Sequence, residues 1–422
     1  NLMDRRKFLK SSVALASLPV TNFPAWAFAQ QARSPDDENF WAIIRNQYEV
    51  TDNVTNLEAG YWGIMSIPVT QDYIKNTHFV NQNSSYYARR LYSKDYDNII
   101  TRIAGKLGVG TDEIVLTRGA TESLQSLING YNKLDEGDTV IYADLDYGSM
   151  QSEMRFLRTH RKVNVVNIAI PEPASYENVI DTYTKALDDN PKCKMMLLTH
   201  VSNRTGLITP VKEITAIAKS RGVDIILDAA HSWGQFEFDF QELSVDFAGF
   251  NLHKWMGVPL GVGAMYIRKN RVLDIDPLRG EASPDNDDVR TRIHTGTINF
   301  AAVMTIPAAF NFRESIGQKN IENRLRSLRD QWVNQVVDNK SVEILTPQDE
   351  RMYAGITSFR LKNKTTYKNN RDLMDILIEK YSIFTVAIRG ISKGGGIRVS
   401  PSLYNSRADM DKLAAAINDM TD

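Results

Sequence analysis

The sequence has very little cysteine, almost no net charge and no long apolar run. Its 422 residues include one cysteine, Cys193, which excludes an internal disulfide and a cysteine cluster that holds a metal. Lys plus Arg number 50 against 51 for Asp plus Glu, a net charge of -1. This balance does not favour a nucleic-acid partner. The 42% of apolar residues suffice for a large core, and the length allows two domains.

Residues 1–33 have the pattern of an export signal. Arg5 and Arg6 precede a modestly apolar run at 11–20, and Ala-Phe-Ala at 27–29 offers a small-x-small cleavage site. The series resembles a twin-arginine signal, so we expect export of the folded protein to the periplasm. The run is too short and too rich in Ser and Ala for a stable membrane anchor. A disordered basic tail is the alternative interpretation.

Two short apolar runs, 223–227 and 246–250, lead into polar, reactive residues. The first run is followed by Asp228 and the second, a few residues later, by Lys254. Buried strands of a parallel sheet have such sequences, and open α/β sheets bind ligands at the carboxyl ends of their strands. We therefore expect an acid and an amine to face one crevice.

This acid and this amine together predict a particular cofactor. A lysine is a good nucleophile only when its pKa is lowered, and burial at a strand end lowers it. A fixed carboxylate keeps a pyridine nitrogen protonated, and a lysine Schiff base with an aspartate at the ring nitrogen is the arrangement of a pyridoxal phosphate site. Taken singly, an Asp such as Asp228 is more often a helix cap and a Lys such as Lys254 a solvated loop charge, and only their combination favours the cofactor site.

The stretch D-x-x-H, followed by N-L-H-K-W and P-x-G, resembles the class V aminotransferase family of fold-type I pyridoxal phosphate enzymes. Within that family it is most similar to the branch named for isopenicillin N epimerase. The resemblance implies that Lys254 forms the Schiff base, that Asp228 pairs with the pyridine nitrogen and that His231 lies beside the ring oxygen. It also places His253 near the phosphate, and we include Asn251, at the same strand end, in the cofactor site.

Turns after three other expected strands extend the predicted cofactor site. Small residues in G-A-T-E, at a strand-to-helix turn, let backbone amides close on an anion, so Ala120 and Thr121 are the expected phosphate cup. An ordinary helix cap has the same sequence. The resemblance implies that Tyr147 stacks on the cofactor and that Asn203, in H-V-S-N, contacts its ring oxygen. Simple packing is the alternative for Tyr147.

Two further segments resemble family motifs that contact the substrate and a partner subunit. Arg398 matches the arginine of R-x-S-x-x-x-Y-N, which binds the substrate's α-carboxylate; a structural arginine paired with an acid is the alternative. His294-Thr295-Gly296-Thr297 resembles W-T-G-T, which reaches the partner's phosphate. This implies a homodimer with Gly296 and Thr297 in the cofactor site, although His294 replaces the usual Trp.

The resemblance implies an α/β fold of fold-type I, with a mostly parallel seven-stranded sheet between helices and a smaller α+β C-terminal domain. We expect residues 34–68 to pack near the small domain and the mouth of the active site, 69–300 to form the cofactor-binding large domain, and 301–422 the small domain. The alternation of strands and helices loosens after 301, where one long helical pattern spans 301–338.

The expected function is a pyridoxal phosphate enzyme that acts on an amino acid or a peptide-borne amine through an α-carbanion. Transamination, epimerisation and elimination remain open. A desulfurase that uses a cysteine nucleophile is disfavoured, because the region 384–397 lacks one and Cys193 lies elsewhere in the sequence. Tailoring of a pyoverdine-like siderophore side chain is the specific hypothesis. The alternatives are a C–S lyase and a protein that binds the cofactor without catalysis.

Overall fold

The large central sheet has seven strands. The computed structural model describes residues 32–281, 286–293 and 296–421. In spatial order the strands are β2 (Ile114–Thr117), β8 (Gly263–Ile267), β7 (Phe247–Asn251), β6 (Asp224–Asp228), β5 (Cys193–Thr199), β3 (Thr139–Ala143) and β4 (Asn164–Ile168). Within this sheet β8 runs antiparallel to both neighbours, and the other pairs are parallel. The predicted mostly parallel sheet is confirmed.

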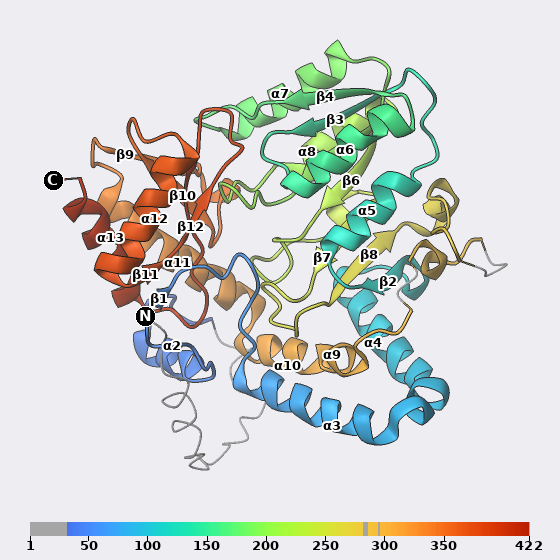
Figure 1. Ribbon diagram of the computed structural model, residues 1–422, viewed down its shortest axis with the longest axis horizontal. Coiled ribbons are helices and arrows are strands. Elements are labelled where there is room, and N and C mark those ends of the chain that lie inside the picture. The colour runs from blue at the N-terminus through green and yellow to red at the C-terminus, as the bar shows by residue number, and fades with distance from the viewer. Residues whose placement is uncertain (1–31, 282–285, 294–295, 422) are drawn as a thin grey trace, which may run out of the picture.

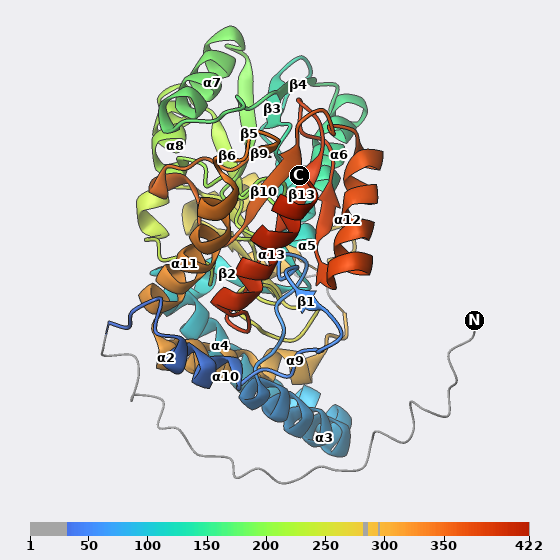
Figure 2. The ribbon, with the colours of Figure 1, turned by 90° about the vertical axis from the view of Figure 1, so that its left-hand side faces the viewer.

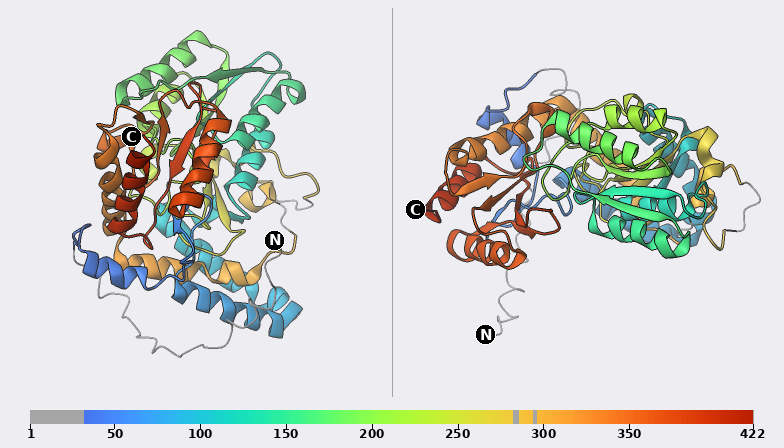
Figure 3. Two further views of the ribbon diagram at one scale, coloured as in Figure 1. Left: turned by 60° about the vertical axis from the view of Figure 1, so that its left-hand side comes forward. Right: turned by 90° about the horizontal axis from the view of Figure 1, so that it is seen from above.

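Helices cover both faces of this sheet, which is why its central strands are apolar almost throughout. The helices α5 (Ala120–Gly130) and α6 (Gly148–His160) pack on one face, where Leu124 and Met154 are buried. The helices α4 (Tyr92–Leu107), α7 (Tyr176–Asp189) and α8 (Val211–Ser220) pack on the other face, where Val179 and Ile214 are buried (Figure 3).

The long helical pattern predicted for 301–338 is wrong in one respect, because it forms three helices. These are α9 (Phe300–Met304), α10 (Ile306–Ile316) and α11 (Gln318–Val336). Pro307 cannot donate a hydrogen bond back into α9, and Gly317 has a φ of 92°, outside the helical region. Figure 1 shows α9 and α10 beside α3 (Ile67–Arg90) along one side of the large sheet.

The smaller C-terminal domain is α+β, as predicted. Its four-stranded antiparallel sheet has the order β12 (Val386–Ile388), β13 (Gly396–Val399), β10 (Thr357–Leu361) and β9 (Val342–Ile344). It packs with α11, α12 (Tyr367–Tyr381) and α13 (Arg407–Asp419) around buried residues such as Trp332, Phe359 and Leu413. Short 3-10 helices span Thr111–Glu113, Gln241–Leu243, Lys269–Asp274, Val289–Arg292 and Glu350–Met352.

The N-terminal segment adds an edge to the small domain. After α2 (Glu38–Arg45), strand β1 (Thr55–Asn56) pairs in parallel with β11 (Ile383–Phe384). Figures 1 and 2 show β1 next to the small domain. The chain also contacts the small domain past β1, since Ala59 N donates to Ser400 O at 2.9 Å. The chain is thereby fixed immediately before a turn that reaches the interdomain cavity.

Within these described ranges, no helix combines the length and the apolar content that crossing a bilayer requires. The same ranges hold no group of three His, Cys, Asp or Glu side chains placed to bind a metal ion. The predicted export signal at 1–33 lies almost wholly outside the described residues and stays a prediction.

Candidate active site

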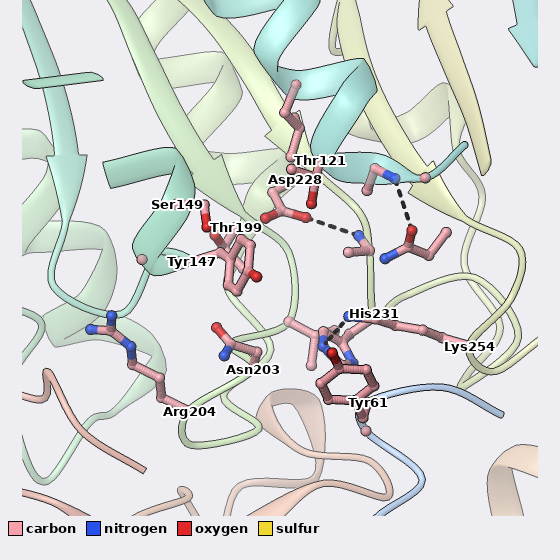
Figure 4. A pocket seen from close by; sticks show the side chains of 18 of the residues that line it. Tyr61, Thr121, Tyr147, Ser149, Thr199, Asn203, Arg204, Asp228, His231 and Lys254 are labelled. Carbon is pink, nitrogen blue, oxygen red and sulfur yellow. Dashed lines mark hydrogen bonds between the residues drawn. The ribbon is translucent and has the colours of Figure 1, made fainter. Parts of the chain in front are cut away.

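A cavity of about 1000 Å³ opens at the carboxyl ends of the central strands. Its walls come from the loops that follow these strands and, on the small-domain side, from β12 and β13. The predicted residues that line it are Ala120, Thr121, Tyr147, Asn203, Asp228, His231, Asn251, His253, Lys254 and Arg398 (Figure 4). Ten side chains from distant parts of the sequence therefore meet at one edge of the sheet, where ligands bind in open α/β folds.

Lys254 carries the reactive amine of this cavity. It lies in the loop after β7, and its Nζ is 2.9 Å from His231 Nε2. Burial lowers the pKa of Lys254 to about 8, against the opposing effect of the Asp228 carboxylate. Part of the Lys254 population is therefore uncharged near neutral pH, and the uncharged amine is the form that attacks an aldehyde or accepts a proton.

His231 is held in one protonation state. Burial, and then the positive charge of Lys254, keeps the pKa of His231 well below its ordinary value, so the ring is neutral. Trp255 Nε1 donates to His231 Nδ1 at 3.2 Å. Since an indole N–H can only donate, Nδ1 is the acceptor nitrogen and the ring proton lies on Nε2. His231 therefore offers an N–H donor to the cavity, beside Lys254.

Asp228 is the last residue of β6, and its side chain is buried. One oxygen accepts a hydrogen bond from Ala230 N at 3.0 Å. Burial raises the pKa of Asp228, an effect that this hydrogen bond and the charge of Lys254 oppose. A buried carboxylate is best kept ionised by a cation that contacts it, and a protonated pyridine nitrogen is such a cation.

The turn before α5 is shaped to hold an anion. Ala120 N donates to Asn251 Oδ1 at 2.8 Å, which ties the helix N-terminus to the end of β7. A Cβ on Gly119 would lie 3.0 Å from Asn251 Oδ1 and 3.2 Å from His253 Cε1, so the absence of a side chain permits this close approach. Free backbone amides and the helix dipole favour a phosphate here, and Thr121 is exposed at the same end.

The residues present fit pyridoxal phosphate. Figure 4 shows the Tyr147 ring between Asp228 and Asn203, with Lys254 reaching in from the opposite side. The Oδ1 atom of Asn203 is buried and has no hydrogen-bond partner among the described residues. An aromatic ligand with a basic nitrogen, a ring oxygen and a phosphate would satisfy these groups together.

Arg398 is already paired with an acid that the sequence reasoning missed. Its Nε donates to Glu58 Oε2 at 3.3 Å, its Nη2 donates to Glu58 Oε1, and its Nη1 donates to Asn203 O at 2.8 Å. Arg398 lines the cavity, whereas Glu58 is not among the residues that line it. The sequence feature that could have indicated Glu58 is that it is the single acid in N-L-E-A-G, a segment otherwise rich in apolar and small residues.

Sequence reasoning also missed Arg204, a buried arginine that lines the cavity and binds backbone carbonyls, with Gly390 O at 2.6 Å. Its signal was a basic residue in the turn directly after Asn203. Gly296 and Thr297 are exposed and are not among the residues that line the cavity. Their neighbours His294 and Thr295 lie outside the described residues.

Cys193 is buried at the start of β5, where Sγ lies 3.6 Å from Met195 O. Burial raises the pKa of its thiol to about 12. Cys193 is not among the residues that line the cavity. The only thiol of the sequence is thus neither ionised nor close to the reactive amine.

Comparison with known proteins agrees with this geometry. The family model described as Aminotransferase class-V matches residues 67–413. Isopenicillin N epimerase of Amycolatopsis lactamdurans is 24% identical, over 90% of this chain and 98% of its own length. The structure of apo cysteine desulfurase from Thermococcus onnurineus NA1 has a TM-score of 0.78 and 21% identity, covering 93% of this chain and 99% of that chain.

A mutant of C-DES with glycine covalently linked to its PLP cofactor has a TM-score of 0.76 and 18% identity, covering 89% of this chain and 99% of that chain. These similarities extend over both domains, and the family model spans the lysine, the aspartate and the arginine of the cavity. The chain therefore belongs to the class-V aminotransferase family, and it is a pyridoxal phosphate-dependent enzyme of fold-type I.

Proposed function

We propose that this enzyme transforms an amino acid or a peptide-borne amine at the carbon that bears the amino group, with Lys254 as the proton carrier. The observation that supports this most is a partly buried lysine amine, with its pKa lowered to about 8, in one cavity with the buried Asp228 carboxylate. Pyridoxal phosphate, when bound, supplies an aldehyde that condenses with amines and a ring that withdraws electrons from the α-carbon.

Each side chain has a task that its position allows. Lys254 would hold the aldehyde of bound pyridoxal phosphate, and its amine, when free, would accept the α-proton of a substrate and return a proton. Asp228 would keep a proton at the ring nitrogen. His231, with its proton on Nε2, would donate to the ring oxygen, and the N-terminus of α5 would hold the phosphate.

We assign proton transfer to a single base, Lys254, and this assignment favours reactions that need one base. Lys254 suffices for transamination and for elimination, whereas epimerisation needs a second acid on the opposite face of the substrate. Sulfur transfer to a thiol of this chain is disfavoured, because Cys193 is buried in β5 with a raised pKa. Transamination is the leading candidate, and elimination, as in a C–S lyase, is the second.

Product analysis tests this proposal. The holoenzyme is incubated with free amino acids and with short peptides that have a free amino terminus. Aminated cofactor indicates transamination, and released ammonia indicates elimination. Lys254→Ala should abolish both products, whereas Lys212→Ala, which removes an exposed lysine paired with Glu242, should not. Equal activity of Lys254→Ala and the wild type would contradict the proposal.

We also propose export to the periplasm and, as the most specific form of the function, tailoring of a pyoverdine-like siderophore side chain there. The support for export is the pattern at 1–33 alone. Fusion of residues 1–33 to a reporter that folds before export should place it in the periplasm. Substituting lysine for both Arg5 and Arg6 should retain the reporter in the cytoplasm, and unchanged export would contradict the twin-arginine interpretation.

A further inference from the structure

The arginine expected to receive a substrate carboxylate is already paired with a carboxylate of its own chain. Arg398 and Glu58 form an ion pair through Nε and Nη2, the side-on fork of the guanidinium, and their side chains are 8% and 6% exposed. This fork is a geometry in which arginine binds a carboxylate with two hydrogen bonds. Glu58 does not line the cavity, but it engages one of the two edges on which Arg398 can bind a carboxylate in this way.

Glu58 is fixed from several sides. Its backbone N–H donates to Asn56 Oδ1 at 3.0 Å, and Ser400 Oγ donates to Glu58 Oε2 at 3.2 Å. A Cβ on Gly60 would lie 2.9 Å from Arg398 Cζ, so the backbone after Glu58 packs directly on the guanidinium. Releasing Glu58 from Arg398 would therefore break the hydrogen bond from Ser400 as well as the ion pair.

The ion pair between Glu58 and Arg398 also neutralises the positive charge that would attract a substrate carboxylate. Three of the five N–H groups of Arg398 are engaged, two by Glu58 and one by Asn203 O. A free substrate carboxylate would meet an arginine whose positive charge is already paired with the Glu58 carboxylate. A like charge in a desolvated site is costly, whereas a neutral carbonyl can accept one of the remaining N–H groups without that cost.

We propose that Glu58 determines substrate specificity by selecting amines that stand beside a neutral carbonyl, as in an amide or the first residue of a peptide, over amines beside a free carboxylate. This inference rests on the proposed function, because it presupposes that the cavity receives a substrate amine. Arg398 then donates to a carbonyl oxygen, and Glu58 opposes free amino acids.

Alanine and alaninamide form a suitable pair of probes, because they have the same side chain but carry a carboxylate and a neutral amide, respectively, beside the amine. Their dissociation constants are measured from the change in cofactor absorbance of the holoenzyme. We expect the wild type to prefer alaninamide, and Glu58→Gln to shift the ratio towards alanine by about tenfold or more, since it removes a like charge. Comparing ratios between variants cancels the different amine pKa values of the two probes.

The matched control is Glu172→Gln. It breaks another pair with a buried arginine of the small domain, Arg360, at 2.5 Å, but neither residue lines the cavity. This variant should leave the ratio unchanged, so a shift caused by general destabilisation would appear here too. Propionate, which has a carboxylate and no amine, should raise the melting temperature of Glu58→Gln more than that of the wild type.

Three results would overturn this inference: tighter binding of alanine than alaninamide by the wild type, an unchanged ratio in Glu58→Gln, or weaker alanine binding in that variant. The last would make Glu58 a positioning residue that prepares Arg398 for carboxylates. The first result needs no variant, so the test survives a misfolded Glu58→Gln protein. If neither amine changes the wild-type absorbance, the proposed function fails, while the propionate measurement still reports on Glu58.

Discussion

Lys254 keeps its amine in a buried cavity, and its protonation therefore depends on pH in an unusual range. Burial lowers its pKa from 10.5 to about 8 in the folded protein. Between these two values the unfolded chain binds a proton that the folded chain does not, so this residue makes folding more favourable as pH rises through that window. As the pH falls below about 8, a growing fraction of this amine is charged, and the charged form reacts poorly.

This dependence is measurable in the cofactor-free protein. Labelling with trinitrobenzenesulfonate, followed by peptide mapping, should reach half its maximal rate at Lys254 near pH 8. Lys212, whose hydrogen bond to Glu242 raises its pKa, should need a more alkaline solution and serves as the internal comparison. A midpoint at Lys254 equal to that of Lys212 would refute the lowered pKa.

Trp255 is a positioning residue for His231. Trp255→Phe keeps an aromatic ring but removes the N–H that fixes the proton on Nε2. We expect kcat to fall about fivefold, since one buried hydrogen bond contributes about 1 kcal/mol. The pH dependence of the cofactor absorbance should change as well. If kcat falls while this pH profile stays the same, the effect is one of packing and the assigned tautomer is wrong.

At the residue scale, the sequence predicted groups that follow one another closely in the chain. Asp228, His231 and Lys254 come from one continuous stretch, so their types and spacing could be interpreted together. Glu58 and Arg398 are 340 residues apart, and no local pattern indicates that they meet. The hydrogen bond from Trp255 to His231 depends on side-chain orientation, which spacing alone does not determine.

The turn between β2 and α5 shows how an element positions the site. A side chain on Gly119 would contact Asn251 and His253, so Gly119→Ala should move the helix N-terminus away from β7. We expect cofactor affinity to fall about tenfold, comparable to the loss of one or two hydrogen bonds, with little change in Lys254 labelling. Titration of the cofactor-free protein with pyridoxal phosphate measures this affinity. Unchanged affinity would place the phosphate elsewhere.

Among the elements, the strands of the large sheet were predictable because they are short, continuously apolar and end in turn residues. The interruption of the helical pattern at Thr305 and Gly317 was not, since the apolar spacing continues across it. Strand β1 was also missed. It has two residues, and it forms only because the small domain offers an edge at β11.

For the molecule as a whole, we propose a homodimer in which Thr297 completes the partner's site. Its exposed position outside the cavity of its own chain is compatible with this. Lys254→Ala and Thr297→Ala should each be impaired, but co-expressed chains should regain about a quarter of wild-type activity, because half of the dimers contain one intact site. Mixed dimers no more active than the better single variant would contradict the shared site.

The two-domain architecture was predictable from length and from the loss of strand–helix alternation after residue 301. We predicted that the N-terminal segment, 34–68, packs near the small domain and the mouth of the active site. The structure adds β1 to the small domain and brings Gly60 and Tyr61 to the cavity. One of the contacts that fix this segment is the backbone hydrogen bond from Ala59 N to Ser400 O, which side-chain patterns do not specify.

The most direct test is reduction of the purified holoenzyme with borohydride, followed by mass spectrometry of its peptides. Pyridoxal phosphate tethered to Lys254 should leave its reduced mass on the peptide that contains this residue, and the yellow colour should bleach. Lys254→Ala should show neither change. A reduced cofactor on a different lysine of the wild type, or bleaching that persists in Lys254→Ala, would contradict the assigned site.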